Sequence, residues 1–483
     1  MSKLTNYFKE TAYYSHLIEK FKAVEELKIT NTNDPVSLLV LQTIFEDLDD
    51  NILIVTPNLY KAQKLYDELI KLQPLDSVSF FPQDEFITTE MLAMSSEFKL
   101  ERINTIRKII ENKKSIIITN TTGFVKYLTP RKTWEKAILK YQLGDTLVVK
   151  EFSKTLISYG YTRESVVEKQ GDFSVKGGII DIYPLNEEKP LRIDLFDDEI
   201  DSIRHFDLTT QRSTIKTKDC VIYPMYEFFY NDDQLKFVVN EINESIKRNN
   251  ITGKSLDRIN EEVTFLTNHH EIDKLSRYLT ILYDKPETIS DYIDYSNVVF
   301  YDHDKILDNY TDVVRDITDW YEHTDDYPKL GFKLIKDINH IYSKKSLYLD
   351  SLSDSKIKIK DVINVRAKDP TLYNNNMHML LKDLKKYDKF TTVVIGFNSQ
   401  KTLKQFISII EDKVRFNIIG TKDEIIEKTL NLIIDEKLVS VELFDINLIS
   451  LNENHLFKQK SLKKAKNINH KLKMLRSCQI LKN

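Results

Sequence analysis

Three groups of side chains in this 483-residue sequence could take part in chemistry, and the first is an acidic run. Its members are Asp194, Asp197, Asp198, Glu199 and Asp201. Carboxylates in this number can hold a divalent cation, but no glycine or histidine pattern of a calcium loop accompanies them. We expect Asp197 to Glu199 to form a turn between two strands, with the other acids facing solvent. The run therefore predicts a polar strand face rather than a metal site.

The second group is a histidine pair, His269–His270, which has no third ligand at local spacing. The third is a pair of cysteines, Cys220 and Cys478, too few for a disulfide framework or a zinc site. The sequence also contains no nucleophile elbow and no Gly-x-x-x-x-Gly-Lys-[Ser/Thr] phosphate loop. We therefore expect a chain that is not an enzyme and binds no metal or cofactor of its own.

The composition is that of a large globular chain in a reducing compartment. The formal net charge is -4, hydrophobic residues make up 41% and charged residues 30%. The length corresponds to about three or four domains. The N-terminus has no apolar core typical of a signal peptide, and no apolar run reaches the roughly 18 to 20 residues that cross a bilayer. We predict a monomeric cytoplasmic protein without a membrane segment.

The residues that must position any site fall into an α/β pattern that is interrupted once. Short apolar strands at 52–55, 77–81 and 116–119 alternate with helical periodicity at 59–69 and 100–110, which implies a parallel sheet. After an antiparallel stretch, helix-rich α/β character returns, with a strand at 298–301. The predicted division is 1–127 and 214–325 for one α/β domain, 128–213 for an inserted module, 326–354 for a helical linker, 355–456 for a separate small α/β domain, and 457–483 for a basic tail.

The inserted module has the clearest strand pattern. Ile179 to Tyr183 lies between the turn pair Gly177–Gly178 and Pro184. Leu191, Ile193 and Leu195 then alternate with Arg192, Asp194 and Phe196, as in a half-buried strand, and 199–206 is predicted to be the returning strand. These features predict an antiparallel sheet.

The last predicted domain and the tail differ sharply in pattern. Strands are predicted at 391–395, 416–419, 432–434 and 448–451, with a helix at 400–410 capped by Asn398 or Ser399. Between Lys458 and Arg476, eight of nineteen residues are Lys or Arg. The tail is interpreted as a solvated linker, with a nucleic-acid-binding arm as the alternative.

Three sequence runs carry a family resemblance: Phe173–Pro184, Arg192–Asp207 and Thr210–Ser213. They resemble the module shared by the excision-repair protein UvrB and the bacterial transcription-repair coupling factor (Mfd) family. Phe81–Glu85, Pro286–Tyr292 and Leu448–Phe457 resemble the coupling factors further. The resemblance implies a UvrB-like, helicase-like but degenerate α/β domain with an inserted module that docks UvrA.

The resemblance also suggests the residues that contact UvrA: Arg163, Phe173, Lys176, Asp181 and Tyr183. Lys176 stands where the family has an arginine, so it keeps the charge but loses the bidentate fork. Other interpretations stay open: Arg163 as an ordinary surface charge, Phe173 as a core residue, and Asp181 and Tyr183 as structural residues.

The resemblance places the family's phosphate loop at Thr30–Ser37, where this sequence has neither Gly nor Lys. Asp34 is predicted to be the N-cap of a helix with Pro35 at its first position. A carboxylate there would occupy the positive helix end that a phosphate needs, and would repel the phosphate. Nucleotide hydrolysis is therefore not expected from this chain.

The function implied is that of the N-terminal part of a coupling factor, which recruits UvrA where RNA polymerase has stalled at a lesion. Polymerase binding, and the ATP and magnesium of a double-stranded-DNA translocase, are expected only in family domains that this sequence does not contain. The alternatives are a UvrB-type helicase subunit and a DNA-binding module acting through the tail.

Overall fold

The computed structural model describes residues 2–84, 96–267, 278–293, 297–323, 333–341, 345–352, 356–387 and 390–457. Its largest sheet is parallel throughout, with seven strands in the order β15-β1-β14-β13-β2-β4-β3. The strands are β1 (Glu26–Thr30), β2 (Ile52–Thr56), β3 (Val78–Phe81), β4 (Ile116–Asn120), β13 (Asn297–Tyr301), β14 (Ser346–Asp350) and β15 (Val362–Asn364). The predicted parallel sheet is therefore confirmed.

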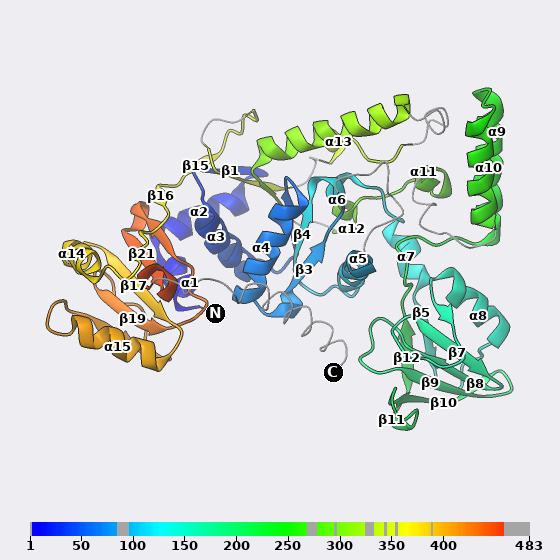
Figure 1. Ribbon diagram of the computed structural model, residues 1–483, viewed down its shortest axis with the longest axis horizontal. Helices are drawn as coiled ribbons and strands as arrows, with labels where there is room; N and C mark the ends of the chain where they lie inside the picture. Colours follow the sequence, from blue (N-terminus) through cyan, green and yellow to red (C-terminus); the bar gives the residue numbers. More distant parts are fainter. Residues whose placement is uncertain are drawn as a thin grey trace.

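Helices cover both faces of this sheet, which we call the body (Figure 1). One face packs on α2 (Ala12–Ala23), α3 (Asp34–Asp47) and α4 (Leu59–Leu72), and α1 (Lys3–Glu10) lies against α2 and α3. The other packs on α5 (Ser96–Ile110), α6 (Thr121–Val125), α12 (Ile289–Tyr292) and α13 (His303–His323). Alternate residues of one strand serve the two cores: Ile54 faces the first and Leu53 the second. Burial on both faces explains why these strands are continuous apolar runs.

A second sheet belongs to the module between β4 and β13. It has six strands in the order β11-β10-β9-β8-β7-β6 and is antiparallel except for the β6–β7 pair. They are β6 (Thr162–Arg163), β7 (Asp172–Lys176), β8 (Ile179–Ile182), β9 (Leu191–Phe196), β10 (Glu199–Phe206) and β11 (Ser213–Thr217). β5 (Leu139–Gln142) pairs with β12 (Asp219–Ile222), and α7 (Arg131–Ala137) and α8 (Val149–Ser158) complete the module. The antiparallel prediction is confirmed.

Beyond the module, α9 (Asp232–Arg248), α10 (Lys254–Thr267) and α11 (Leu279–Leu282) share a small core of their own. The chain then returns to the body through α12 and β13. Single turns of 3-10 helix occur at Leu75–Ser77, Ile338–His340 and Phe444–Ile446. None of the helices in the described ranges is both long enough and apolar enough to cross a membrane.

The third large sheet, which with its helices we call the C-terminal unit, has the order β16-β20-β21-β17-β19-β18. Its elements are β16 (Ala367–Lys368), α14 (Met377–Tyr387), β17 (Thr392–Phe397), α15 (Gln400–Ile410), β18 (Asn417–Ile419), β19 (Leu430–Ile434), β20 (Val441–Leu443), β21 (Leu448–Asn452) and α16 (Glu453–Leu456). Of the two expected caps of α15, the structure selects Ser399, whose hydroxyl accepts from Thr402 N.

Two sequence predictions need correction in the body. Ser346–Asp350, expected within a helical linker over 326–354, is the buried strand β14, and Val362–Asn364, expected in the separate domain, is the edge strand β15. Short apolar runs of this length carry too little periodicity to separate strand from helix. The domain boundaries themselves stay predictions.

The start of α3 also differs from expectation. Asn33, not Asp34, is the N-cap, because the Asn33 amide oxygen accepts from Val36 N at 3.0 Å. Asp34 lies in the first turn with Pro35 after it. This frees the Asp34 carboxylate for other partners.

Candidate functional site: a docking patch on the module and a cleft in the body

The module's sheet presents one apolar face to its core. Phe173, Ile180, Ile182 and Ile193 pack there against Phe152 of α8 and neighbouring side chains. Because side chains alternate along each strand, the intervening residues stand on the opposite, outer face. The outer face is therefore the part of this sheet that a partner can reach.

Ion pairs fix the middle of the outer face. Arg192 donates to both oxygens of Asp181, from Nε at 2.7 Å and from Nη2 at 2.8 Å, and its guanidinium lies 4.8 Å from the centre of the Phe206 ring. One strand further, Asp194 accepts from Ser202 Oγ at 2.6 Å and pairs with Arg204 at 2.8 Å. A bidentate pair of this kind holds its side chains rigidly.

One end of the outer face is apolar and exposed. Phe196, the last residue of β9, is 76% exposed, and Ile179, the first of β8, is 41% exposed. Lys176 pairs in register with Ile179, which pairs with Asp194 on the other side. Lys176, Ile179 and Phe196 therefore share one face at one end of three neighbouring strands, and we call them the docking patch.

Three of the predicted contact residues are buried instead. Phe173 has no exposed surface and lies in the module core, so its prediction as a direct contact needs correction and the core interpretation holds. Asp181 is buried beneath its ion pair with Arg192. Tyr183 is also buried and donates its hydroxyl to the Glu188 carbonyl at 2.8 Å, and burial raises the pKa of its phenol. The burial and internal partners of Asp181 and Tyr183 favour the structural interpretation, and their roles as contacts stay predictions.

The two predicted cations, Arg163 and Lys176, are both exposed but are not brought together. Arg163 pairs in register with Phe173, so it shares the face of that residue, whereas Lys176 alternates onto the outer face. Their roles as contacts stay predictions, and only Lys176 belongs to the patch.

Sequence reasoning missed Phe196, although the signal was present. In Leu191–Phe196 the polar residues Arg192 and Asp194 mark the outward positions, and Phe196 falls on that same side. An aromatic residue in the polar register of a strand is an unusual exposure. The acidic run forms a turn at Asp197 and Asp198, where Asp197 takes a positive φ of 53°. Two details differ from expectation: Glu199 already belongs to β10, and Asp194 pairs with Arg204 and does not simply face solvent. Among the described residues no acidic, histidine or cysteine group could hold a metal ion. His269–His270 lies outside those residues.

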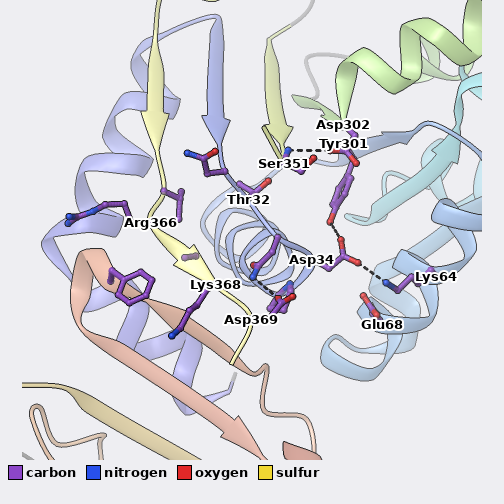
Figure 2. Close-up of a pocket in the computed structure, with 16 residues that line it drawn as sticks. Thr32, Asp34, Lys64, Glu68, Tyr301, Asp302, Ser351, Arg366, Lys368 and Asp369 are labelled. Carbon is purple, nitrogen blue, oxygen red and sulfur yellow. Dashed lines mark hydrogen bonds and ion pairs between the residues drawn. The ribbon is translucent and has the colours of Figure 1, made fainter. Parts of the chain in front are cut away.

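A second candidate lies where strands of the body's sheet end, the edge at which open α/β sheets bind ligands. It is an open cleft of about 980 Å³ between α3, the strand ends and β16 (Figure 2). Asp34 projects into it and accepts from Lys61 Nζ, Lys64 Nζ and Tyr301 Oη, each at 2.7 Å. Burial alone would raise the pKa of the Asp34 carboxyl, but these three donors bring it well below its ordinary value.

Other charges around the cleft also have partners within the protein. Asn33 Nδ2 donates to Asp369 at 2.8 Å, and Lys368 pairs with Glu442 at 3.2 Å. Arg366 Nε donates to Asp445 at 2.7 Å. The Asp34 carboxylate thus lies in the first turn of α3 with three donors of its own, and Lys368 and Arg366 at the cleft are paired with acidic residues.

Comparison with known protein families gives a match within the module. Residues 139–228 match the family model of the UvrB interaction domain. The chain is 23% identical to the transcription-repair-coupling factor of Bacillus subtilis and 25% identical to that of Staphylococcus epidermidis, in each case over 96% of its own length. Over 62% of the chain, identity to the Staphylococcus aureus factor is 30%.

The chain spans about 41% of the length of the first two of these relatives, and the aligned part covers 26% of the Staphylococcus aureus factor. The family resemblance noted in the sequence is confirmed: this chain is a relative of the transcription-repair coupling factors, and its residues 139–228 match the UvrB interaction domain.

Proposed function

We propose that this chain docks UvrA through the outer face of its UvrB interaction domain, and so takes part in recruiting UvrA to lesions where RNA polymerase has stalled. The observation that carries the proposal is the docking patch, an exposed aromatic beside a lysine on a domain of the UvrB interaction family. Contact with the polymerase and movement on DNA are assigned to parts of the longer relatives that this chain does not span.

The physical character of the patch suits a protein partner. An exposed phenylalanine loses little side-chain entropy on burial and can fill a partner's apolar pocket, as interface anchors do. Lys176 beside it would steer an acidic surface into register. The ion pairs of Asp181 with Arg192 and of Asp194 with Arg204 hold the strands beneath, so that the patch is preorganised.

The same proposal makes the body a scaffold without nucleotide chemistry. Asp34 and its three donors fill the place of a phosphate, and a second anion there would meet a carboxylate of the same sign. We propose that this chain neither binds ATP and magnesium at the cleft nor hydrolyses ATP. This distinguishes it from a UvrB-type helicase subunit.

Titration calorimetry with purified UvrA tests the docking proposal. Lys176→Glu and Phe196→Ala should each weaken binding at least about tenfold, because an anchor and a steering charge are lost. Lys216→Glu is the matched control: it makes the same charge reversal on the exposed edge strand β11, four strands away in the sheet. Undiminished binding by the Lys176 and Phe196 variants would move the interface off the patch.

The role of Arg163 can be resolved in the same titration. Arg163→Glu reports whether the opposite face of the sheet also contacts UvrA. The DNA-binding alternative for the tail, the monomeric state and the cytoplasmic location stay predictions.

A further inference from the structure

The sheet of the C-terminal unit has two apolar faces, and its own helices cover only one. Val393, Ile395 and Phe397 of β17 pack in a core with α14 and α15. Val394 of the same strand and Ile433 of β19 face the other way and belong to the core of the body. The sheet is mixed, but its strands β21, β17, β19 and β18 pair in parallel. Parallel strands need both faces covered, so the second face depends on residues from elsewhere in the chain.

The first helix of the chain lies on that second face. Tyr7 of α1 is buried, and its hydroxyl is 3.0 Å from Thr392 Oγ1 at the start of β17. One turn earlier, Lys3 Nζ donates to the carbonyls of Gly420 and Asp423, beside β18. Lys3 and Tyr7 are four residues apart, so one side of α1 makes these contacts.

The opposite side of α1 is attached to the body. The Phe8 ring centre lies 5.4 Å from that of Tyr14 on α2, and Lys9 pairs with Glu46 and Asp47 on α3. Because α1 has only eight residues, it would hardly be helical alone, and both sets of contacts are needed to hold it. Figure 1 shows α1 between the strands of the C-terminal unit and the body helices.

We propose that α1 is a strap that fixes the C-terminal unit to the body. It covers the second face of the sheet β16–β21. When its contacts with that sheet are removed, the C-terminal unit alone should open more often, while the body stays folded. The module with the docking patch lies at the other end of the molecule, so the strap acts independently of the proposed UvrA contact (Figure 1).

Hydrogen exchange of the whole chain tests the strap. The double variant Lys3→Ala/Tyr7→Ala removes both contacts, and we expect exchange in Thr392–Phe397 and Leu430–Ile434 to rise at least about tenfold, since a buried aromatic is lost. Exchange in β2 and β4 should not change. Asn6→Ala, on the exposed side of the same helix, is the matched control and should behave as the parent.

Two further measurements keep the proposal open to refutation. Tyr7→Phe keeps the ring and removes only the bond to Thr392, so it should raise the same exchange a few-fold even if the double variant unfolds. UvrA titration should be the same for parent and strap variants, which separates failure of the strap from failure of the docking function. Unchanged exchange in both variants, or an equal rise in β2 and β4, would overturn the strap.

Discussion

The strand-end cleft of the body and the outer face of the module are both rich in charge, but they leave different side chains exposed. At the cleft, Asp34 already has Lys61, Lys64 and Tyr301 as partners. On the module, Phe196 and Ile179 stand in solvent beside Lys176, above a layer of ion pairs. Charged groups that already pair with one another gain little free energy from binding a charged ligand. An exposed aromatic side chain on a rigid sheet, by contrast, is stabilised when a partner buries it.

The largest effect should come from the ion pair that joins the body to the module. Arg102 of α5 is fully buried, lies 3.8 Å from the centre of the Phe81 ring, and donates to Glu227 at the end of the module. Arg102→Met would leave the buried Glu227 carboxylate uncompensated, which typically costs about 3–5 kcal/mol of the free energy of unfolding. Urea unfolding measures this loss.

The double variant Arg102→Met/Glu227→Gln is the control for that loss. Because it removes both charges, much of the stability should return. If the double variant is as unstable as the single one, the guanidinium acts through packing on Phe81 and the charge pair does not couple the two regions.

Acid should weaken the body through a buried histidine. His303 is 1% exposed, between the rings of Phe300 and Tyr348, and burial lowers its pKa to about 4, against the weaker opposing effect of Asp304. In the unfolded chain the imidazole binds a proton near pH 6.5, so between pH 6.5 and about 4 the unfolded state binds more protons. Stability is therefore present above pH 6.5 and falls as the pH decreases, by up to about 3 kcal/mol.

The variant His303→Phe isolates this effect. Urea unfolding of parent and variant at pH 7, 6, 5 and 4.5 gives the difference in their free energies of unfolding, from which the titration of other groups cancels. The parent should lose more stability on acidification than the variant. Parallel pH curves would show that His303 binds its proton at the same pH in the folded and unfolded states.

The patch should be separable from the fold. Phe196→Ala should weaken UvrA binding by about 2 kcal/mol, roughly 30-fold, if Phe196 is an anchor, while the urea midpoint moves little because the side chain is exposed. Ile215→Ala, on the same sheet and 64% exposed, is the matched control. If both variants lost the same UvrA affinity, binding would depend on any exposed apolar residue of the sheet, and the docking patch would not be a specific site.

Local pattern in the sequence was sufficient for the elements that carry their own periodicity or capping. Leu191–Phe196 alternates along its whole length, and the Ser399 cap and apolar spacing define α15. The strands β14 and β15 were misassigned because their burial comes from neighbours far along the chain: β1 lies between them although over 300 residues separate it from either. Short apolar or mixed runs do not carry that information.

The site was harder to predict for a related reason. Family resemblance pointed to the correct module, but residue type alone could not tell which face each side chain takes. Phe173 and Phe196 are both phenylalanines next to polar neighbours, and register places one inside and the other outside. The strap formed by α1 was beyond sequence reasoning, because Tyr7 and Thr392 are 385 residues apart.

The smallest effect tests whether the cleft holds a charged carboxylate of its own, that of Asp34. Asp34→Asn keeps the shape of the side chain and removes the charge that Lys61 and Lys64 share. A third of the Asp34 side chain is exposed, so solvent screens the pairs and the expected loss is only about 1 kcal/mol at pH 7. Because the donors hold the folded pKa below its ordinary value, that contribution is complete above about pH 4 and is lost as the pH falls further.

The difference in unfolding free energy between parent and Asp34→Asn should therefore be constant from pH 7 to 5 and shrink toward pH 3. Asp302→Asn is a useful comparison, because Asp302 also lines the cleft but pairs with Lys305 and Ser351 instead. A difference that grows on acidification would mean that Asp34 is protonated in the folded protein. The cleft would then hold no resident anion, and its contrast with the exposed patch would rest on shape alone.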